Sequence, residues 1–312
     1  MKIVIPEVLI DEPLQRLRAR HDVVYDPTLV ERPAELLEAA RDADALVIRV
    51  RTQMRGELLE SLTRCKVIGR QGVGLDNIDV ERCRERGIRI IPAIGANARS
   101  VAEYVMTTAM MMLRGAYLSS AEVAAGKWPR APMLLGREIW GRTLGLVGFG
   151  SIGQVTARLA KAMGMEVLAH DPSLEPASPV LAEFGCRLLP LDDLLAASDV
   201  VSLHLPLVPG TRRLFDAARL ACMKPGSVLV NAARGGIVDE AALADALRRG
   251  RPYAAAIDVF ESEPLGPGSP LADAPNLLLT PHIGGLTADS EIRVSNLVVD
   301  RVLEVLAQHP ET

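Results

Sequence analysis

The feature that most constrains the fold is a regular alternation of short apolar runs with longer amphipathic segments. The second half of the chain has six such runs, separated by stretches with apolar residues at helical spacing. This alternation is typical of βαβ units, whose crossovers place helices on both faces of a parallel sheet. The predicted strands of this series span residues 144–147, 166–169, 199–203, 227–230, 254–257 and 277–279.

A shorter series of the same kind precedes it. Its predicted strands span residues 3–5, 23–25, 45–50 and 66–69, and a long helical segment at residues 101–119 separates the two series. A chain of 312 residues also exceeds the roughly 150 residues of an ordinary domain. We therefore expect an α/β protein with two doubly wound parallel sheets.

The last helical segment predicts how the two domains are connected. After Pro281 the chain ends in one amphipathic helix, which cannot form a domain alone and must pack on the first one. We predict a first domain at residues 1–98 that is completed by residues 287–312, with the second domain, residues 99–286, inserted into it. Domain closure is expected where the chain crosses, near residues 98 and 286. The apolar positions of the helix are Ile292, Val298, Val299, Val302, Leu303 and Leu306.

Composition and charge exclude several classes of function. Hydrophobic residues make up 49% of the chain and charged residues 24%, which is typical of a globular protein and excludes disorder as the main state. Lys and Arg number 35 against 39 Asp and Glu, giving a net charge of −4. No global basic field attracts nucleic acid or an anionic membrane. We expect the partners to be small molecules or other copies of the chain.

The cysteines and the amino terminus indicate the compartment. The four cysteines have no metal-ligand spacing and are too sparse for a disulfide scaffold, so we expect no metal and a reducing environment. The apolar run at residues 1–6 is too short for a signal peptide. Residues 101–118 are interrupted by Glu103 and Arg114, whereas a membrane span needs roughly 20 mostly apolar residues. We expect a cytoplasmic protein.

A glycine-rich loop between a predicted strand and a predicted helix indicates a dinucleotide site. The loop fits the pattern G-x-G-x-x-G, and the amide groups at the start of the following helix can bind a pyrophosphate. The next strand ends at Asp171, close to the roughly 20-residue spacing at which an acid accepts the ribose 2′-hydroxyl. We therefore predict NAD rather than NADP, although such glycines alone could simply form a tight turn. The loop residues are Gly148, Phe149, Gly150, Ser151, Ile152 and Gly153.

Three later segments place reactive side chains where predicted strands end, the edge at which α/β sheets bind ligands. His282 could take the hydroxyl proton while a hydride leaves a 2-hydroxy acid, because imidazole exchanges protons near neutral pH. Glu263 would orient its ring, and Arg234 could bind the substrate carboxylate and polarise the carbonyl oxygen. Each residue alone could instead be structural: a surface ion-pair partner, a loop acid or a turn residue.

Several motifs stand in order along the chain: Gly72-Val-Gly74-Leu-Asp-Asn77-Ile-Asp79, Ser100-Val-Ala-Glu103, the glycine loop, Asn231-Ala-Ala-Arg234-Gly-Gly, Asp258-Val-Phe-Glu-Ser-Glu263-Pro264 and Pro281-His282. Together they resemble the D-isomer-specific 2-hydroxyacid dehydrogenase family. The resemblance implies a Rossmann NAD-binding domain inserted into a flavodoxin-like substrate domain, and an Arg-Glu-His catalytic set formed by Arg234, Glu263 and His282. Glu263 stands where related formate dehydrogenases have Gln, which argues against formate.

The resemblance also implies binding residues outside the catalytic set. Gly72, Val73 and Gly74 would offer backbone amides to the substrate carboxylate. Asp258 would receive the nicotinamide carboxamide, and Ala233 is expected beside the cofactor. These roles rest on the position of each residue within its motif.

Arginines near the expected substrate site suggest a second anionic group on the acid. Family members that act on 3-phosphoglycerate have similar arginines at the positions of Arg49 and Arg70, and Arg130 resembles another. With Arg51, these side chains favour 3-sulfolactate or 3-phosphoglycerate, and residues 25–30, 49–52 and 95–98 look more like sulfolactate dehydrogenases. Arg49 and Arg51 could instead be solvated edge charges. With 312 residues, we expect no carboxy-terminal serine-sensing domain of the kind that many phosphoglycerate dehydrogenases carry.

The helix at residues 101–118 carries more apolar surface than one internal contact readily covers. We predict a homodimer through this helix, with ordinary core packing as the alternative. An NADH-sensing corepressor with the same fold is the alternative function, because fold alone does not settle activity. The apolar residues of the helix are Tyr104, Met106, Met110, Met111, Met112 and Leu113.

Overall fold

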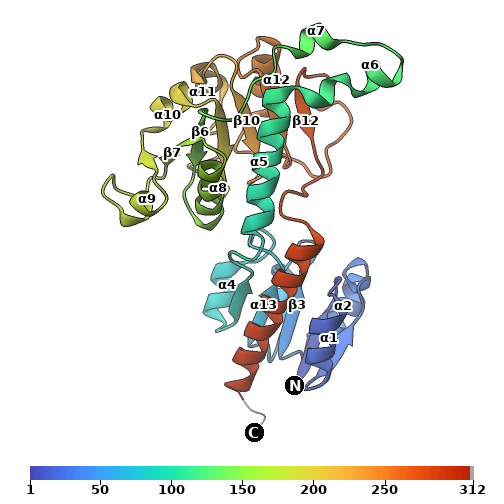
Figure 1. The fold of residues 1–312 in the computed structure, drawn as a ribbon. Coiled ribbons are helices and arrows are strands. Elements are labelled where there is room, and N and C mark those ends of the chain that lie inside the picture. Colours follow the sequence, from blue (N-terminus) through green and yellow to red (C-terminus); the bar gives the residue numbers. More distant parts are fainter. Residues whose placement is uncertain (310–312) are drawn as a thin grey trace. The chain divides into compact units, whose positions relative to one another are not determined.

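The computed structural model describes residues 1–309 and divides the chain into two compact units (Figure 1). Unit 1 consists of Met1–Asn97 and Leu286–Thr312, and unit 2 consists of Ala98–Gly285. Each unit is built around one sheet whose paired strands are all parallel. The two doubly wound parallel sheets confirm the predicted fold class.

The sheet of unit 1 has five strands in the flavodoxin-like order. The edge strand β5 was not predicted, because its sequence Arg-Ile-Ile-Pro is short and ends in proline, which is tolerated at an edge. β3 ends at Ile48, so Arg49 and Val50 lie in the following loop and not in the strand as predicted. In sheet order the strands are β2 (Asp22–Tyr25), β1 (Lys2–Ile5), β3 (Ala45–Ile48), β4 (Val67–Arg70) and β5 (Arg89–Pro92).

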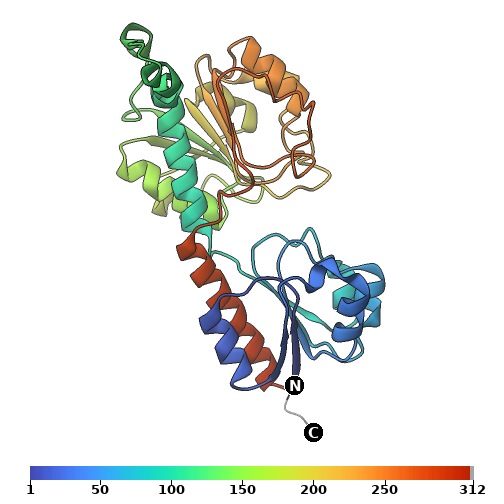
Figure 2. The ribbon, with the colours of Figure 1, turned by 90° about the vertical axis from the view of Figure 1, so that its right-hand side faces the viewer.

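Helices cover both faces of this sheet (Figure 2). One face carries α1 (Asp11–Arg18) and α13 (Ala288–Ala307), and α13 begins with a capping box formed by Thr287 and Ser290. Of its predicted apolar face, Val298, Val299, Val302 and Leu306 are buried, whereas Ile292 is 52% exposed, so that part of the prediction is wrong. The other face carries η1 (Leu29–Glu31), α2 (Pro33–Ala40), α3 (Gly56–Ser61) and α4 (Val80–Glu85).

The sheet of unit 2 has seven strands in Rossmann-type order, one more than the six predicted. The additional strand β8 is a two-residue edge strand, too short to give a sequence signal. In sheet order the strands are β12 (Leu277–Leu279), β11 (Ala254–Ile257), β10 (Val228–Asn231), β9 (Val200–Leu203), β6 (Thr143–Val147), β7 (Glu166–His170) and β8 (Arg187–Leu188).

Two helical layers cover the sheet of unit 2 (Figures 1 and 2). One layer contains α5 (Ala98–Arg114), α8 (Ser151–Ala162) and α9 (Pro179–Glu183), and the other contains α10 (Leu191–Ala197), α11 (Ala217–Cys222) and α12 (Glu240–Arg248). Met106, Met112 and Leu113 of α5 are buried in the first layer, so for these three side chains the alternative of ordinary core packing is correct.

The segment after α5 extends beyond the sheet of unit 2 (Figure 1). It contains η2 (Ala116–Ser119), α6 (Ser120–Ala124) and α7 (Arg130–Met133). Across residues 1–309, we find no helix with the length and hydropathy needed to cross a bilayer.

Candidate active site

The glycine-rich loop joins β6 to α8 and leaves room for a ligand. Gly148 has a φ of +98°, and a Cβ at this position would lie 2.4 Å from the carbonyl oxygen of His204, so only glycine fits. Gly150 caps α8, and no atom lies within 4 Å of where its Cβ would be. Ser151, Ile152 and Gly153 form the first turn of α8. The amide groups of this turn therefore face a position where a pyrophosphate can approach.

Asp171 follows β7 beside this loop. Its Oδ2 accepts a hydrogen bond from the backbone N–H of Phe149 at 2.9 Å, and its Oδ1 accepts from the N–H and the hydroxyl of Ser173 at 2.9 and 2.7 Å. Burial alone would raise the pKa of Asp171, but these hydrogen bonds outweigh it and hold the pKa below its usual value. An ionised carboxylate beside the glycine loop fits the ribose hydroxyls of NAD and repels a 2′-phosphate.

The loops after β10, β11 and β12 lie directly against one another. These strands are neighbours in a parallel sheet, so their carboxyl ends share one edge. A Cβ on Gly235 would lie 1.7 Å from the carbonyl oxygen of Phe260, which leaves no space for any side chain there. A Cβ on Gly284 would lie 3.1 Å from that of Ala232. The three loops that carry the predicted catalytic residues thus form one surface.

His282 and Glu263 are in direct contact on this surface. His282 Nδ1 lies 2.7 Å from Glu263 Oε2, and Glu263 Oε1 accepts from the N–H of Phe260 at 3.0 Å. Because an ionised carboxylate only accepts, the imidazole must donate from Nδ1, which leaves Nε2 for a substrate. The side chains are 48% and 37% exposed and line a pocket of about 330 Å³ together with Phe260 and Thr280.

Arg234 lies on the loop after β10, held by Asn231. The amide group of Asn231 donates to the carbonyl oxygen of Arg234 at 3.1 Å, and its carbonyl oxygen accepts from the N–H of Ala233 at 3.1 Å. The guanidinium donates from Nη1 to the carbonyl oxygen of Ala233 at 2.6 Å. Asn231 stands in one of the family-like motifs without an expected role, and the structure shows that it shapes the Arg234 loop.

Asp258 is a buried carboxylate at the end of β11. It accepts hydrogen bonds from the Thr280 hydroxyl at 2.6 Å and from the N–H groups of Ile283 and Gly284 at 2.8 and 2.7 Å. Tyr104, on α5, lies with its hydroxyl 2.7 Å from that of Thr280. Sequence reasoning assigned Tyr104 to a helix surface and gave Thr280 no role, because neither residue type indicates a site by itself.

The predicted substrate arginines lie where strands of unit 1 end. Arg49, after β3, forms a bidentate ion pair with Glu291 of α13 at 2.6 and 2.7 Å, and Arg51 pairs with Glu31 at 2.9 Å. Arg49 and Glu291 are only 22% and 25% exposed, so Arg49 is not a freely solvated charge. Arg51 and Glu31 are 55% and 56% exposed, so for Arg51 the alternative interpretation of a solvated edge charge fits the structure. Buried Glu7 holds their loop, since it accepts from the N–H groups of Arg49, Arg51 and Thr52.

Arg70 and Gly72 are also in contact within unit 1. Arg70 ends β4 and donates from Nη1 to the carbonyl oxygen of Gln71 at 2.7 Å. A Cβ on Gly72 would lie 1.8 Å from Arg70 Nη1, so the guanidinium lies against this glycine. Val73 and Gly74 follow in the same loop.

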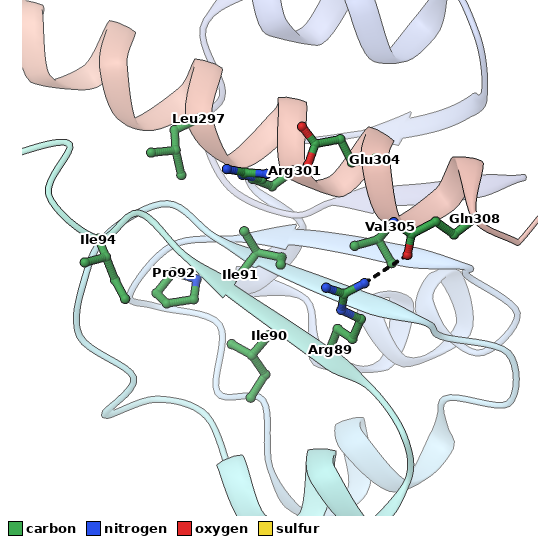
Figure 3. A pocket seen from close by; sticks show the side chains of 10 residues that line it. All are labelled: Arg89, Ile90, Ile91, Pro92, Ile94, Leu297, Arg301, Glu304, Val305 and Gln308. Atoms are coloured by element: carbon green, nitrogen blue, oxygen red, sulfur yellow. Dashed lines mark hydrogen bonds and ion pairs between the residues drawn. The ribbon is translucent and has the colours of Figure 1, made fainter.

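A second hollow lies elsewhere on unit 1, between the edge strand β5 and α13 (Figure 3). Its volume is about 390 Å³, and Ile91, Leu297 and Val305 give it apolar walls. Arg89 donates to Gln308 across one end at 3.1 Å. None of the predicted site residues lines this hollow, so it is separate from the positions that the motifs indicate.

Comparison with known proteins identifies the family. A family model described as the NAD-binding domain of D-isomer-specific 2-hydroxyacid dehydrogenases matches residues 106–284, more than half of the chain. The chain belongs to this family. The family's NAD-binding domain lies within unit 2 of this dehydrogenase, where the glycine loop and Asp171 provide a site that fits NAD.

Comparison with individual relatives of the dehydrogenase supports the same family assignment. An (S)-sulfolactate dehydrogenase from Chromohalobacter salexigens is 48% identical over 97% of this chain and 98% of its own length. The crystal structure of a D-lactate dehydrogenase from Aquifex aeolicus, complexed with NAD and lactic acid, superposes with a TM-score of 0.82 at 28% identity, covering 99% of this chain and 96% of that one.

A D-3-phosphoglycerate dehydrogenase from Mycobacterium tuberculosis is 42% identical over 88% of this chain and 51% of its own length. The present dehydrogenase therefore spans about half the length of that relative. The comparisons confirm an NAD-dependent 2-hydroxyacid dehydrogenase, as the sequence predicted. None of the three relatives named here is a transcriptional corepressor, so the sensor alternative gains no support.

Proposed function

We propose that Arg234, Glu263 and His282 catalyse hydride transfer between NAD and a small 2-hydroxy acid that carries a second anionic group. The observation that carries this proposal is the 2.7 Å hydrogen bond between His282 and Glu263 at the mouth of a pocket. It brings together a proton-transfer group and its orienting acid from the loops after two consecutive strands, β11 and β12. Arg234 lies on the loop adjacent to both.

The chemistry of the chain's own groups follows from this arrangement. His282 Nε2 removes the hydroxyl proton of the acid, and the O–H electron pair becomes the second bond of the carbonyl while the hydrogen on the same carbon leaves as hydride with the C–H electron pair. In the reverse direction His282 returns the proton. Glu263 fixes the tautomer of the ring and stabilises the imidazolium that forms. Arg234 binds the carboxylate and the developing carbonyl oxygen. NAD, when bound, accepts or supplies the hydride.

The residues proposed to bind the cofactor lie on unit 2. The first turn of α8 would hold the pyrophosphate, and Asp171 the adenosine ribose. Ala233 and Asp258, at the ends of β10 and β11, would lie beside the nicotinamide end. The loop residues involved are Gly148, Phe149, Gly150, Ser151, Ile152 and Gly153.

We propose that unit 1 is the substrate-binding domain and that the acid is 3-sulfolactate, with 3-phosphoglycerate as the second candidate. The high identity to an (S)-sulfolactate dehydrogenase over nearly the whole chain supports this order. The amides of Gly72, Val73 and Gly74 would bind the carboxylate. We propose that Arg49, Arg51 and Arg70 bind the second anionic group of the substrate, because a planar guanidinium matches the spacing of the oxygens of a sulfonate or a phosphate.

Substrate profiling tests this proposal. Purified protein with saturating NAD is assayed at 340 nm with 3-sulfolactate, 3-phosphoglycerate, glycerate and lactate. We expect the highest kcat/KM with 3-sulfolactate. A preference for lactate or glycerate would remove the second anionic group from the proposal. No turnover of any 2-hydroxy acid, together with tight NADH binding, would favour the sensor alternative.

We also propose a homodimer, supported by exposed apolar side chains in the segment after α5. Trp128 is 78% exposed, Leu134 78% and Leu135 85%, and Val123 is also exposed. Large apolar side chains gathered on one surface segment are typical of protein interfaces. Arg130 lies exposed among them at the start of α7. Gel filtration at micromolar concentration should show a dimer, and Leu134→Asp with Leu135→Asp should give a monomer; a monomeric unsubstituted protein would contradict this.

A cytoplasmic location is part of the same proposal. Cys65, Cys83, Cys186 and Cys222 are all free thiols, as expected in a reducing compartment. Burial raises the pKa of Cys65 to about 12 and that of Cys83 to about 11, so both thiols stay protonated. Fractionation of the source cells should recover the protein with cytoplasmic markers; recovery with exported proteins would refute the location.

A further inference from the structure

A chain of hydroxyl groups connects α5 to the loop that carries His282. Tyr104 Oη lies 2.7 Å from Thr280 Oγ1, and Thr280 Oγ1 donates to Asp258 Oδ1 at 2.6 Å. The chain therefore passes from a helix, through the end of β12, to the end of β11. All three residues belong to unit 2.

The direction of each hydrogen bond in this chain is determined. Asp258 as a carboxylate can only accept, so the single hydroxyl proton of Thr280 is used towards Asp258. Thr280 then has only lone pairs to offer, and Tyr104 must donate to it. Burial raises the pKa of Tyr104 to about 12, so the phenol keeps the proton that this requires.

Asp258 in turn holds the backbone around His282. Its side chain accepts from the N–H groups of Ile283 and Gly284, and its main-chain oxygen accepts from the N–H of His282 at 2.8 Å. His282 has a φ of +56°, a conformation that residues other than glycine rarely adopt and that needs external support. Three consecutive amide groups at the histidine are thus fixed by one aspartate.

We propose that Tyr104 and Thr280 are positioning residues that act through Asp258 to fix the backbone of His282 for proton transfer. The proposal rests on the proposed role of His282 and extends it to two residues whose hydroxyl groups bond to each other and to Asp258, whereas the imidazole bonds to Glu263. Removing the hydroxyl of Thr280 takes away one of the three hydrogen bonds that fix the Asp258 side chain, and this loosens the hold of Asp258 on the amides of Ile283 and Gly284. The imidazole then no longer points reproducibly at the reacting hydroxyl.

Variants that delete each hydroxyl test the positioning role. Thr280→Val should lower kcat on the order of tenfold to a hundredfold with little change in the KM of the acid, because a small displacement of a catalytic group costs this much. Thr280→Ser keeps the donor and should restore kcat. Tyr104→Phe should lower kcat by about fivefold, the effect of one neutral hydrogen bond.

The double variant separates positioning from a general loss of stability. Once Thr280 is valine, Tyr104 has no partner to orient, so Tyr104→Phe should then lower kcat no further. All assays are run well below the melting temperature of each variant. The proposal would be overturned if the fold-decrease in kcat of the double variant equalled the product of the fold-decreases of the two single variants. An unchanged kcat in Thr280→Val would overturn it as well.

A readout independent of turnover distinguishes failure of this inference from failure of the proposed function. Hydrogen–deuterium exchange of the peptide that contains residues 280–285 should be faster in Thr280→Val than in the unsubstituted protein and in Thr280→Ser. Unchanged exchange at these amides would refute the positioning role of Thr280 and Tyr104 even if the enzyme is active. If the unsubstituted protein oxidises none of the four acids, the proposed function fails. The exchange result alone then decides whether Thr280 and Tyr104 hold the backbone around His282.

Discussion

The two sheets use charged residues in opposite ways at their carboxyl ends. In unit 2, Asp258 binds N–H groups of the neighbouring loop, whereas Glu263 binds an N–H group of its own loop and contacts the partly exposed His282. In unit 1, guanidinium groups lie at the strand ends, and carboxylates such as Glu291 hold them. The same fold class therefore carries the proposed proton-transfer group on one sheet and the proposed anion-binding groups on the other, and the difference lies in the loops.

The amino ends of the two sheets are alike. Asp44, before β3, accepts from the N–H of Lys2 at 2.9 Å, and Asp199, before β9, accepts from the N–H of Thr143 at 3.1 Å. Burial would raise the pKa of both, but hydrogen bonds and nearby cations outweigh it and lower the pKa in each case. The ends without a proposed ligand thus use one common device to join neighbouring strands.

The largest expected effect comes from a substitution that removes the proposed proton-transfer group of unit 2 and leaves unit 1 unchanged. His282→Ala should lower kcat by about a hundredfold to ten-thousandfold, the usual contribution of a general acid–base group. NADH binding, followed by its fluorescence, should be retained, because the glycine loop is untouched. His309→Ala, an exposed histidine at the end of unit 1, is the matched control and should keep full activity. Substantial activity in His282→Ala would assign proton transfer to another group.

The second prediction tests whether the two amino ends are equivalent. Asp44→Asn and Asp199→Asn should each lower the free energy of unfolding by roughly 2 kcal/mol, as expected when a hydrogen-bonded charge is lost. Urea titration measures both. Asp42→Asn removes an exposed partner of Lys2 and should cost at most about 1 kcal/mol. If Asp42→Asn and Asp44→Asn lowered the free energy of unfolding equally, the buried hydrogen bond of Asp44 to the strand would contribute no more than the exposed ion pair of Asp42.

The lowered pKa values of Asp44 and Asp199 predict how the stability of the protein depends on pH. The folded pKa of both aspartates is lowered from 3.8, so their stabilisation is complete above the unfolded pKa and is lost as pH falls through the folded value. The stability of the unsubstituted protein should therefore decline below about pH 4, the region where aspartates titrate. Each Asn variant should show a shallower decline. An identical pH profile in the variants would assign acid unfolding to other carboxylates.

The smallest expected effect concerns the arginines of unit 1. Arg49→Gln should raise the KM for 3-sulfolactate by about tenfold, since a hydrogen bond to a charged group contributes on the order of 1.5 kcal/mol or more. The KM for lactate, which lacks the second anionic group, should stay the same. Arg84→Gln, a strongly exposed arginine on unit 1, controls for the loss of one charge. A parallel rise for both acids would show that Arg49 supports the loop and does not select the substrate.

Much of the fold and of the candidate site was predictable because the signals are local. The glycine loop, Asp171, Glu263 and His282 stand beside apolar runs that read clearly as strands or helices. β5 was missed because its apolar run is short and ends in proline, and β8 was missed because two residues are too few to leave an apolar pattern. The burial of Met106 and Met112 in the core could not be separated from an interface by periodicity, which shows a face but not what covers it.

The sequence by itself determined the two βαβ series, the nucleotide loop and the identity of the residues at the strand ends, because hydrophobic periodicity and glycine spacing act within one or two elements. Only the tertiary structure decided that His282 contacts Glu263, that Tyr104 reaches Asp258 through Thr280, and that Glu7 and Glu291 hold the loop of Arg49. These contacts join different loops and helices, with partners between 19 and 242 positions apart in the chain. Their geometry depends on sheet order and on the packing of whole helices, which no short stretch of sequence contains.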